Sequence, residues 1–244
     1  MKNSTFYILL VFLLLQVSCG KKSHETRQYV VNVDSLFINL DSVDVSRRAS
    51  QVDCFFHGLA NAGLNGAVLY AEQGKVVYEN AFGYRKLTGR HRDSLRVDDA
   101  FQLSSDSKMF TAEAVMLLYA QGKLDYDDDV RKYIPELPYE GVTIRHLLNH
   151  RSGLPRYDTV ADEFWPDRTQ PFSNEEMIKM LAERKPERYA APDVTFFYNN
   201  INYALLASVV ERVSGQHFED FMHDNIFEPL GMEHSYIFSM RDDT

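Results

Sequence analysis

The chain has 244 residues, of which 45% are apolar and 25% are charged, a composition typical of one globular domain or two small ones. This composition excludes a disordered, collagen-like or coiled-coil chain. Lys and Arg number 26 against 35 Asp and Glu, so the formal net charge is −9 and the basic surface that nucleic-acid binding requires is missing. Two cysteines in a chain this long exclude a disulfide framework. We therefore expect a globular protein with no nucleic-acid partner.

The first 18 residues have the pattern of a secretory signal peptide. Residues 6–15 form an unbroken apolar run, too short to span about 30 Å of hydrocarbon as a helix. Cys19 follows this region directly and resembles a bacterial lipoprotein cleavage site, although Gln16 stands where Leu is usual. We expect Cys19 to carry lipid and residues 19–45 to form the tether, with export without lipid as the alternative. The protein would then be a lipoprotein of the cell envelope, in the periplasm or at the outer membrane.

The first folded elements are predicted to be a helix and a hairpin. From Ser46 on, apolar residues recur at helical spacing, and Gly63 predicts the end of this helix. Cys54 lies within the helix, where we expect it to be a small buried apolar side chain. Strands are predicted over residues 66–71 and 76–82, joined by a tight turn.

Most of the chain after Phe101 is predicted to be helical. Helices are expected to begin at Ser104 or Ser105 and at Thr143, to follow a capping box at 173–176, and to run over about 202–213 and 218–227. No second strand pair stands out, although a two-stranded hairpin alone is only marginally stable. The sheet is therefore expected to be incomplete in this chain.

Ser105 and Lys108 form a candidate nucleophilic pair. Residues three apart on a helix lie on one face, so the Lys amine can touch the Ser hydroxyl and activate it. The same spacing occurs at 18–21, across the predicted cleavage site, so spacing alone is a weak signal. The apolar stretch before Ser105 leads directly into an amphipathic helix, which distinguishes this pair from the one at 18–21. Taken alone, the pattern is still more typical of a helix cap followed by a solvated lysine.

Tyr198 and Asn200 form a second candidate element. A phenol beside an ammonium group has its pKa lowered, so Tyr198 next to Lys108 could act as a general base. Asn200 could orient Lys108 or the substrate through its amide. The same Tyr-x-Asn pattern recurs at 78–80 inside the predicted hairpin, where it indicates ordinary strand sequence.

Four ordered segments of the chain together resemble one known family. They are FQLSSDSKMFTAEAVMLLYAQGKLDYDDDVRKYIPEL, TIRHLLNHRSGLP, TFFYNNINYALLASVVERVSG and IFEPLGMEHS. This order is similar to that of the serine β-lactamase-related hydrolases, which include class C β-lactamases, D-alanyl-D-alanine carboxypeptidases and esterases. The resemblance covers about residues 50–240. It implies an α+β fold of the β-lactamase and transpeptidase type for residues 46–244, with a helical portion and an antiparallel sheet.

The resemblance also implies roles for the candidate residues. Ser105 would be the covalent nucleophile, Lys108 and Tyr198 would share the proton transfers, and Asn200 would position Lys108 and the substrate. The backbone N–H of Ser105 would supply one oxyanion-hole donor. The family's third motif, Lys or His followed by any residue and Gly on a further strand, does not occur after Tyr198. We therefore expect a fragment of a longer protein or the product of a truncated gene.

A further family segment is expected to be structural. It contains His146, His150, Ser152 and Gly153. The two histidines could share a metal, but no Glu follows His146 as metalloproteases require, so packing or capping is expected instead. Asn199 stands where relatives often carry Ser, a change that we expect to be mild.

An acidic stretch and a tryptophan offer weaker alternatives. Residues 125–129 with Glu136 resemble part of a calcium loop, but Val130 stands where the turn requires Gly, so a solvated acidic connection is expected. Trp165 could line a substrate cleft or cover a loop. No metal and no cofactor are predicted.

The favoured function is a cell-envelope serine hydrolase that acts through an acyl-enzyme on an amide or an ester. The substrate would be a cell-wall D-alanyl peptide, a β-lactam or a small ester, and the sequence does not choose among them because specificity depends on pocket shape. The alternative is a non-catalytic envelope lipoprotein of the same fold, degenerate or truncated. An unrelated helical binding protein would require the order of the four segments to be a coincidence. Membrane contact is expected through the lipid anchor only, and no oligomeric state is indicated.

Overall fold

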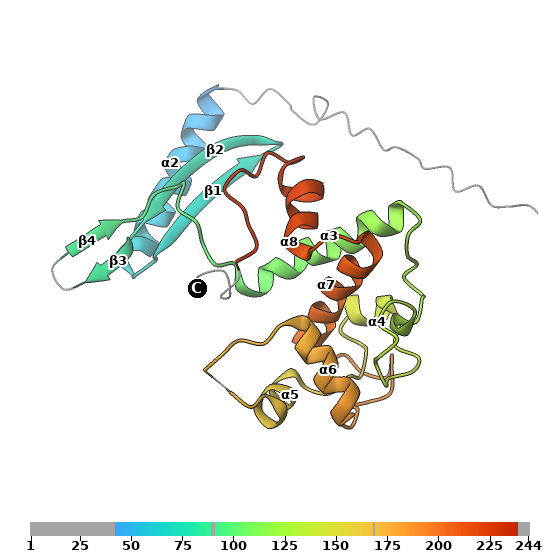
Figure 1. Ribbon diagram of the computed structural model, residues 1–244. Helices are drawn as coiled ribbons and strands as arrows, with labels where there is room; N and C mark the ends of the chain where they lie inside the picture. The colour runs from blue at the N-terminus through green and yellow to red at the C-terminus, as the bar shows by residue number, and fades with distance from the viewer. Residues whose placement is uncertain (1–41, 89–90, 168, 239–244) are drawn as a thin grey trace, which may run out of the picture. The chain divides into compact units, whose positions relative to one another are not determined.

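A computed structural model describes residues 42–88, 91–167 and 169–238 (Figure 1). The predicted signal peptide and Cys19 lie outside these residues. Within the described part of the chain, no helix is both long enough and apolar enough to cross a membrane.

The described residues divide into two compact units. A helical unit comprises Thr111–Phe221, and a mixed unit of helix and strand comprises 42–110 and 222–238. The elements along the chain confirm the expected α+β class.

Helix α2 (Ser42–Asn61) opens the mixed unit and packs against strand β2. The Tyr78 hydroxyl donates a hydrogen bond to Asp53 Oδ1 at 2.8 Å, and the rings of Phe56 and Phe82 stack with centroids 6.4 Å apart. The predicted helix is confirmed, although it begins at Ser42 rather than Ser46. Both contacts tie one side of the helix to the hairpin.

Cys54 is exposed, so the prediction that it is a buried apolar side chain is wrong. An α-helix turns 100° per residue, so Cys54 lies about 200° around the helix from Phe56, which faces β2. Phe55, which lies between these two positions, is also exposed. The helix therefore turns both an apolar ring and a thiol outward.

The predicted hairpin is confirmed as an antiparallel pair of strands, β1 (Gly66–Glu72) and β2 (Lys75–Phe82). The two residues between them, Gln73 and Gly74, both have positive φ, at 52° and 77°. Positive φ at both central residues is the signature of the type I′ turn, whose twist matches that of the strands.

A second hairpin follows that the sequence analysis missed. Strands β3 (Tyr84–Thr88) and β4 (His91–Ser94) pair with each other and form a separate two-stranded sheet. Arg85 Nε donates to Asp93 Oδ2 at 3.0 Å across this pair. The strands are rich in charged residues and lack apolar alternation, which is the signal from which strands are predicted.

The helical unit is an assembly of helices joined by loops and turns of varied length (Figure 1). The elements are α3 (Ser107–Ala120, within this unit from Thr111), η3 (Val130–Lys132), α4 (Ile144–Leu148), α5 (Tyr157–Phe164), α6 (Asn174–Arg184), α7 (Asn200–Ser214) and α8 (Phe218–Met222, within this unit to Phe221). Thr143 and Ser173 both form capping boxes at the predicted helix starts.

Helix α7 is the central element of the helical unit, because α4 and α6 both pack against it. Its side chains at Leu205, Leu206, Val209 and Val210 are completely buried. Burial of an aliphatic side chain of this size contributes about 1.5–3 kcal/mol relative to exposure. The first turn of α7, which carries Asn200, is therefore attached to the best-packed part of the unit.

Candidate active site

Ser105 and Lys108 are brought together in the mixed unit. Ser105 lies in a 3₁₀ turn, η2 (Ser104–Asp106), immediately before α3 begins at Ser107. Lys108 Nζ donates a hydrogen bond to Ser105 Oγ at 3.2 Å, as the three-residue spacing predicted. Ser105 is exposed, so its hydroxyl is accessible from solvent.

The backbone just before this pair is strained. Ser104 has φ of +53°, a left-handed conformation that residues other than Gly seldom adopt. Such conformations cost about 1–3 kcal/mol and cluster at functional sites. The predicted helix start at Ser104 or Ser105 is thus replaced by a strained turn followed by the helix.

Tyr198 and Asn200 lie in the helical unit, on either side of the residue that caps α7. Asn199 is this N-cap, and its side chain accepts a hydrogen bond from Ile201 N–H at 3.1 Å. Tyr198 is 47% exposed, and Asn200 is exposed at the first position of the helix. The cap fixes the backbone of both candidates while their side chains face outward.

A hollow of about 200 Å³ adjoins Tyr198 and Asn200. It is lined by Arg156, Tyr157, Asp158, Phe197, Tyr198, Asn199 and Asn200. Arg156 forms two hydrogen bonds with the Asp158 carboxylate, at 3.1 and 2.8 Å, and these lower the pKa of Asp158. Burial raises the pKa of Tyr157, so its hydroxyl stays protonated at neutral pH. The hollow thus offers an ion pair, aromatic rings and the candidate phenol.

A buried polar network supports Tyr198 from behind. His150, Ser152, Asn199 and Asn202 are all at least nine-tenths buried. Ser152 Oγ donates to Asn202 Oδ1 at 2.6 Å, and Asn202 Nδ2 lies 3.0 Å from His150 Nδ1. The segment expected to be structural therefore packs directly against the candidate base.

Two members of this network have roles that the sequence analysis did not assign. The side chain of Asn199 both caps α7 and donates to the Pro155 carbonyl at 2.7 Å, and the mildness of the change from Ser stays a prediction. Asn202 was not singled out at all. A buried Asn among the apolar residues of a helix was the available signal, because a buried amide requires partners.

Gly153 lies where the loop that carries His150 and Ser152 contacts the loop before Tyr198, and this position requires glycine. Its φ is +67°, and a Cβ at this position would lie 2.0 Å from the Ala190 carbonyl oxygen. Ala190 N–H donates to the Gly153 carbonyl at 3.2 Å, so the two backbones are in direct contact. Only Gly allows this approach without displacement.

The two candidate pairs thus belong to different units. Ser105 and Lys108 meet in the mixed unit, whereas Tyr198 and Asn200 adjoin the hollow in the helical unit. The contact of Tyr198 with Lys108 stays a prediction.

Trp165 covers a loop, the second of the two interpretations that its sequence context left open. Its indole N–H donates to the Gln170 carbonyl at 2.8 Å, and its ring lies 5.3 Å from that of Phe172. It does not line the hollow beside Tyr198.

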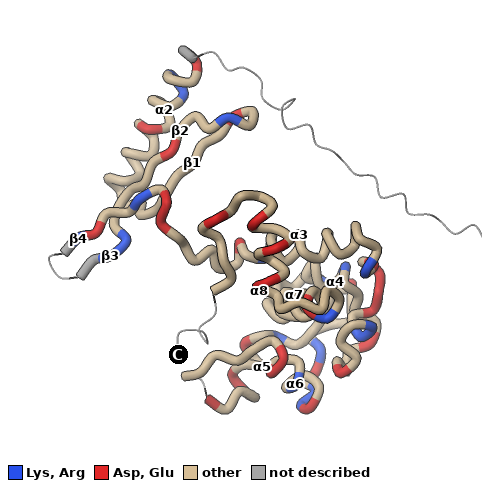
Figure 2. The backbone as a smooth tube through the Cα atoms, turned by 45° about the horizontal axis from the view of Figure 1, so that its top comes forward, with Lys and Arg blue, Asp and Glu red and all other residues tan. Residues whose placement is uncertain are grey.

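The acidic stretch at 125–129 is a hydrogen-bonded turn rather than a simply solvated connection. Asp127 pairs with Arg145, Asp128 with Lys132, and Asp129 with Arg131. Figure 2 shows positive and negative residues interspersed over the helical unit. Three of the carboxylates that resembled a calcium loop therefore have cationic partners from the chain itself.

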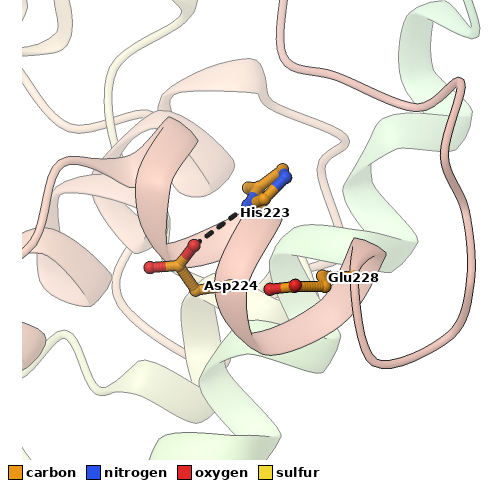
Figure 3. Close-up of side chains that lie close together, drawn as sticks. All are labelled: His223, Asp224 and Glu228. Atoms are coloured by element: carbon orange, nitrogen blue, oxygen red, sulfur yellow. Dashed lines mark hydrogen bonds and ion pairs between the residues drawn. The ribbon is translucent and has the colours of Figure 1, made fainter.

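Two groups of side chains that include histidine are candidates for metal binding. His146 accepts from Thr143 N–H in the capping box of α4, and His150 is buried, so packing and capping are confirmed for both. In the mixed unit, His223, Asp224 and Glu228 offer ligand atoms within 4.8 Å of one another (Figure 3). All three are exposed, and His223 Nδ1 pairs with Asp224 at 2.9 Å, so we assign them no metal.

The amino-acid sequence of this chain matches a known family. The sequence profile of the Beta-lactamase family matches residues 53–243. Penicillin-binding protein 4* of Bacillus subtilis (strain 168) is 40% identical over 177 residues, which cover 72% of this chain and 39% of that protein. The chain therefore spans about two fifths of the length of this curated relative.

Solved structures agree with this match. The penicillin binding protein from Bacillus halodurans superposes with a TM-score of 0.66 at 28% identity, over 77% of this chain and 56% of that one. EstCE1, described as a hydrolase with promiscuous acyltransferase activity, superposes with a TM-score of 0.62 at 25% identity, over 77% of this chain and 51% of that one. These matches exclude an unrelated helical binding protein. The chain belongs to the Beta-lactamase family and has the α+β fold of its β-lactamase and penicillin-binding relatives.

Proposed function

We propose that this protein is a serine hydrolase that forms an acyl-enzyme on Ser105. The observation that carries the proposal is the 3.2 Å hydrogen bond from Lys108 Nζ to Ser105 Oγ, at an exposed and strained turn. Family membership supports the same assignment, because both residues lie within the matched region. A serine hydroxyl becomes a useful nucleophile when a neighbouring group accepts its proton.

The reaction would proceed in two balanced steps. Ser105 Oγ attacks the carbonyl carbon of the substrate, and its proton passes through the unprotonated Lys108 amine to the Tyr198 phenolate. Tyr198 then protonates the leaving amine or alcohol as the C–N or C–O bond to the acyl carbon breaks. Water then attacks the acyl-enzyme, gives one proton back to Ser105 and releases the carboxylic acid. The Ser105 backbone N–H would stabilise the oxyanion in both steps.

The substrate class proposed is a small amide or ester. Cell-wall D-alanyl peptides, β-lactams and small esters all fit this description. Relatives named as penicillin-binding proteins favour the first two. EstCE1 is described as a hydrolase and acyltransferase and favours general acyl chemistry.

The proposed location is the cell envelope, with Cys19 carrying the lipid anchor. The apolar run before Cys19 supports this location. The net charge of −9 favours a small-molecule or peptidoglycan-peptide partner over nucleic acid.

Intact-mass analysis of the full chain after exposure to a fluorophosphonate, and separately to a penicillin, tests this function. The variants are Ser105→Ala and, as a matched control, Ser107→Ala, which removes an exposed hydroxyl two residues away. We expect one adduct on the unmodified chain and on Ser107→Ala, and none on Ser105→Ala. A penicillin adduct would select D-alanyl-peptide chemistry. Folded protein without any adduct would support the non-catalytic alternative instead.

A further inference from the structure

His150 holds the backbone on both sides of Tyr198. The Phe197 N–H donates to the His150 carbonyl at 2.8 Å, and the Asn199 N–H donates to His150 Nδ1 at 3.2 Å. The His150 ring lies against the Tyr198 ring, with centroids 4.5 Å apart and planes tilted by 37°. One residue thus contacts Tyr198 and both of its neighbours.

These contacts define the protonation of the imidazole. A backbone N–H can only donate, so His150 Nδ1 must be the acceptor and carries no proton. Asn202 Nδ2 lies 3.0 Å from the same nitrogen and donates to it as well. The neutral ring therefore carries its proton on Nε2.

The orientation of His150 is itself fixed by buried groups. Asn202 Oδ1 accepts from Ser152 Oγ at 2.6 Å, and Ser152 Oγ accepts from Leu154 N–H at 3.2 Å. His150 has φ of +54° and is only 8% exposed. A strained backbone and a satisfied buried network leave the imidazole a single orientation.

Burial alone does not fix the position of the Tyr198 side chain, so this side chain needs the support of His150. Nearly half of its surface is open to solvent, so its phenol has no closed pocket of its own. Displacement of a catalytic group by about 1 Å can lower a rate by about 10²-fold. A proton-transferring phenol in such an exposed position requires a fixed backbone.

We infer that His150 is a positioning residue for Tyr198: its unprotonated Nδ1 fixes the Asn199 amide and thereby the placement of the phenol. This inference rests on the proposed role of Tyr198 in acylation of Ser105. His150 acts through Tyr198 and does not itself exchange a proton with the substrate.

Replacing His150 with Asn or with Gln separates the effect of its hydrogen bond to Asn199 from the effect of its ring. In His150→Asn, Oδ1 is bonded to Cγ where Nδ1 is bonded in His, so an acceptor remains in place. In His150→Gln, the amide oxygen lies one carbon further along and the acceptor is lost. His146→Gln is the matched control, because Gln at this position can still serve the capping box of α4.

The first readout is turnover of a chromogenic ester, from which kcat and KM are measured, together with the rate at which a fluorophosphonate phosphonylates Ser105, followed by intact mass. We expect His150→Gln to lower kcat about 10- to 100-fold with KM changed less than about threefold, since positioning affects the chemical step. His150→Asn should recover the rate to within about threefold of the unmodified chain, and His146→Gln should not change it. Full activity of His150→Gln, or equal losses in the Asn and Gln variants, would overturn the inference.

The second readout does not depend on activity. Amide hydrogen exchange should be faster at Asn199 in His150→Gln but not in His150→Asn, and ¹⁵N spectra of the unmodified chain should show an unprotonated Nδ1 at His150. Unchanged exchange at Asn199 in both variants would overturn the inference. If the unmodified chain takes no label at all, the proposed function fails, and exchange at Asn199 alone then decides whether His150 fixes this backbone.

Discussion

The two halves of the candidate site are ordered by opposite means. Ser105 and Lys108 lie three residues apart on an exposed turn, and local backbone geometry brings them together. Tyr198 depends on His150, which lies about fifty residues earlier in the chain and holds the neighbouring Asn199 amide. The nucleophile is thus ordered by sequence neighbours and the candidate base by tertiary packing.

The local half should be the more sensitive to loss of a single group. Replacing Lys108 with Met removes the amine that contacts Ser105 Oγ. We expect covalent labelling of Ser105 to slow by about 10²- to 10⁴-fold, the usual contribution of general acid–base catalysis. The measurement is the time course of fluorophosphonate labelling by intact mass. Lys123→Met, at an exposed position beyond α3, is the control and should label at the original rate. Equal rates for the two variants would remove Lys108 from the mechanism.

The packed half should lose the most stability when its core is truncated. Leu205 is completely buried in α7, so Leu205→Ala should lower the free energy of unfolding by about 2–5 kcal/mol. Leu69 is 62% exposed on β1, and Leu69→Ala should change the free energy by less than about 0.5 kcal/mol. Urea denaturation measures both. Similar losses at the two positions would contradict the contrast between a closed helical core and an open hairpin.

Helix capping should have a smaller, local effect. Ser173 Oγ accepts a hydrogen bond from the Glu176 N–H, and the Ser173 N–H donates to the Glu176 carboxylate. Ser173→Ala should therefore lower the free energy of unfolding by about 1 kcal/mol. Ser50 is exposed within α2, and Ser50→Ala is the control, with no loss expected. A shift of the urea midpoint for Ser50→Ala as large as that for Ser173→Ala would argue against the cap.

The acidic turn should make stability depend weakly on pH. Burial of Asp129 pushes its pKa upward, but hydrogen bonds from the Arg131 side chain and from the Arg131 and Gly141 N–H groups outweigh it and leave the pKa lowered. As the pH falls, the Asp129 carboxylate is therefore protonated in the unfolded state before it is protonated in the folded state. The contribution of Asp129 to the free energy of unfolding is complete above a pH of about 4 and is lost as the pH falls through the lowered pKa.

The urea midpoint should therefore fall more steeply below about pH 4 in the unmodified chain than in Asp129→Asn. Parallel curves for the two proteins would show that Asp129 does not contribute.

Local rules accounted for the features that could be predicted. The helix start at Thr143, the capping box at Ser173 and the turn of the first hairpin follow from residues within four positions of one another. The contact of Lys108 with Ser105 is of the same kind. Each depends on backbone geometry that the sequence encodes directly.

The missed features depend on side chains distant in sequence or on weak local signals. Asn202 lies in α7, and its buried hydrogen bonds are to His150 and Ser152, which are about fifty residues away in the sequence. The local sequence around Asn202 therefore did not indicate its partners. The outward position of Cys54 depends on which side of α2 meets β2, and apolar spacing alone did not choose it. The charged strands β3 and β4 lack the alternation by which strands are predicted.

The central claim is that both halves serve one reaction at Ser105. The most direct test is the acylation rate of Tyr198→Phe, with Tyr189→Phe as the control, because Tyr189 stacks on Phe197 at 4.2 Å and Phe retains that ring. We predict that Tyr198→Phe slows adduct formation at Ser105 by at least about 100-fold, while Tyr189→Phe does not change it. Adduct formation at the original rate in Tyr198→Phe would contradict the account and leave Ser105 and Lys108 as a nucleophile without this base.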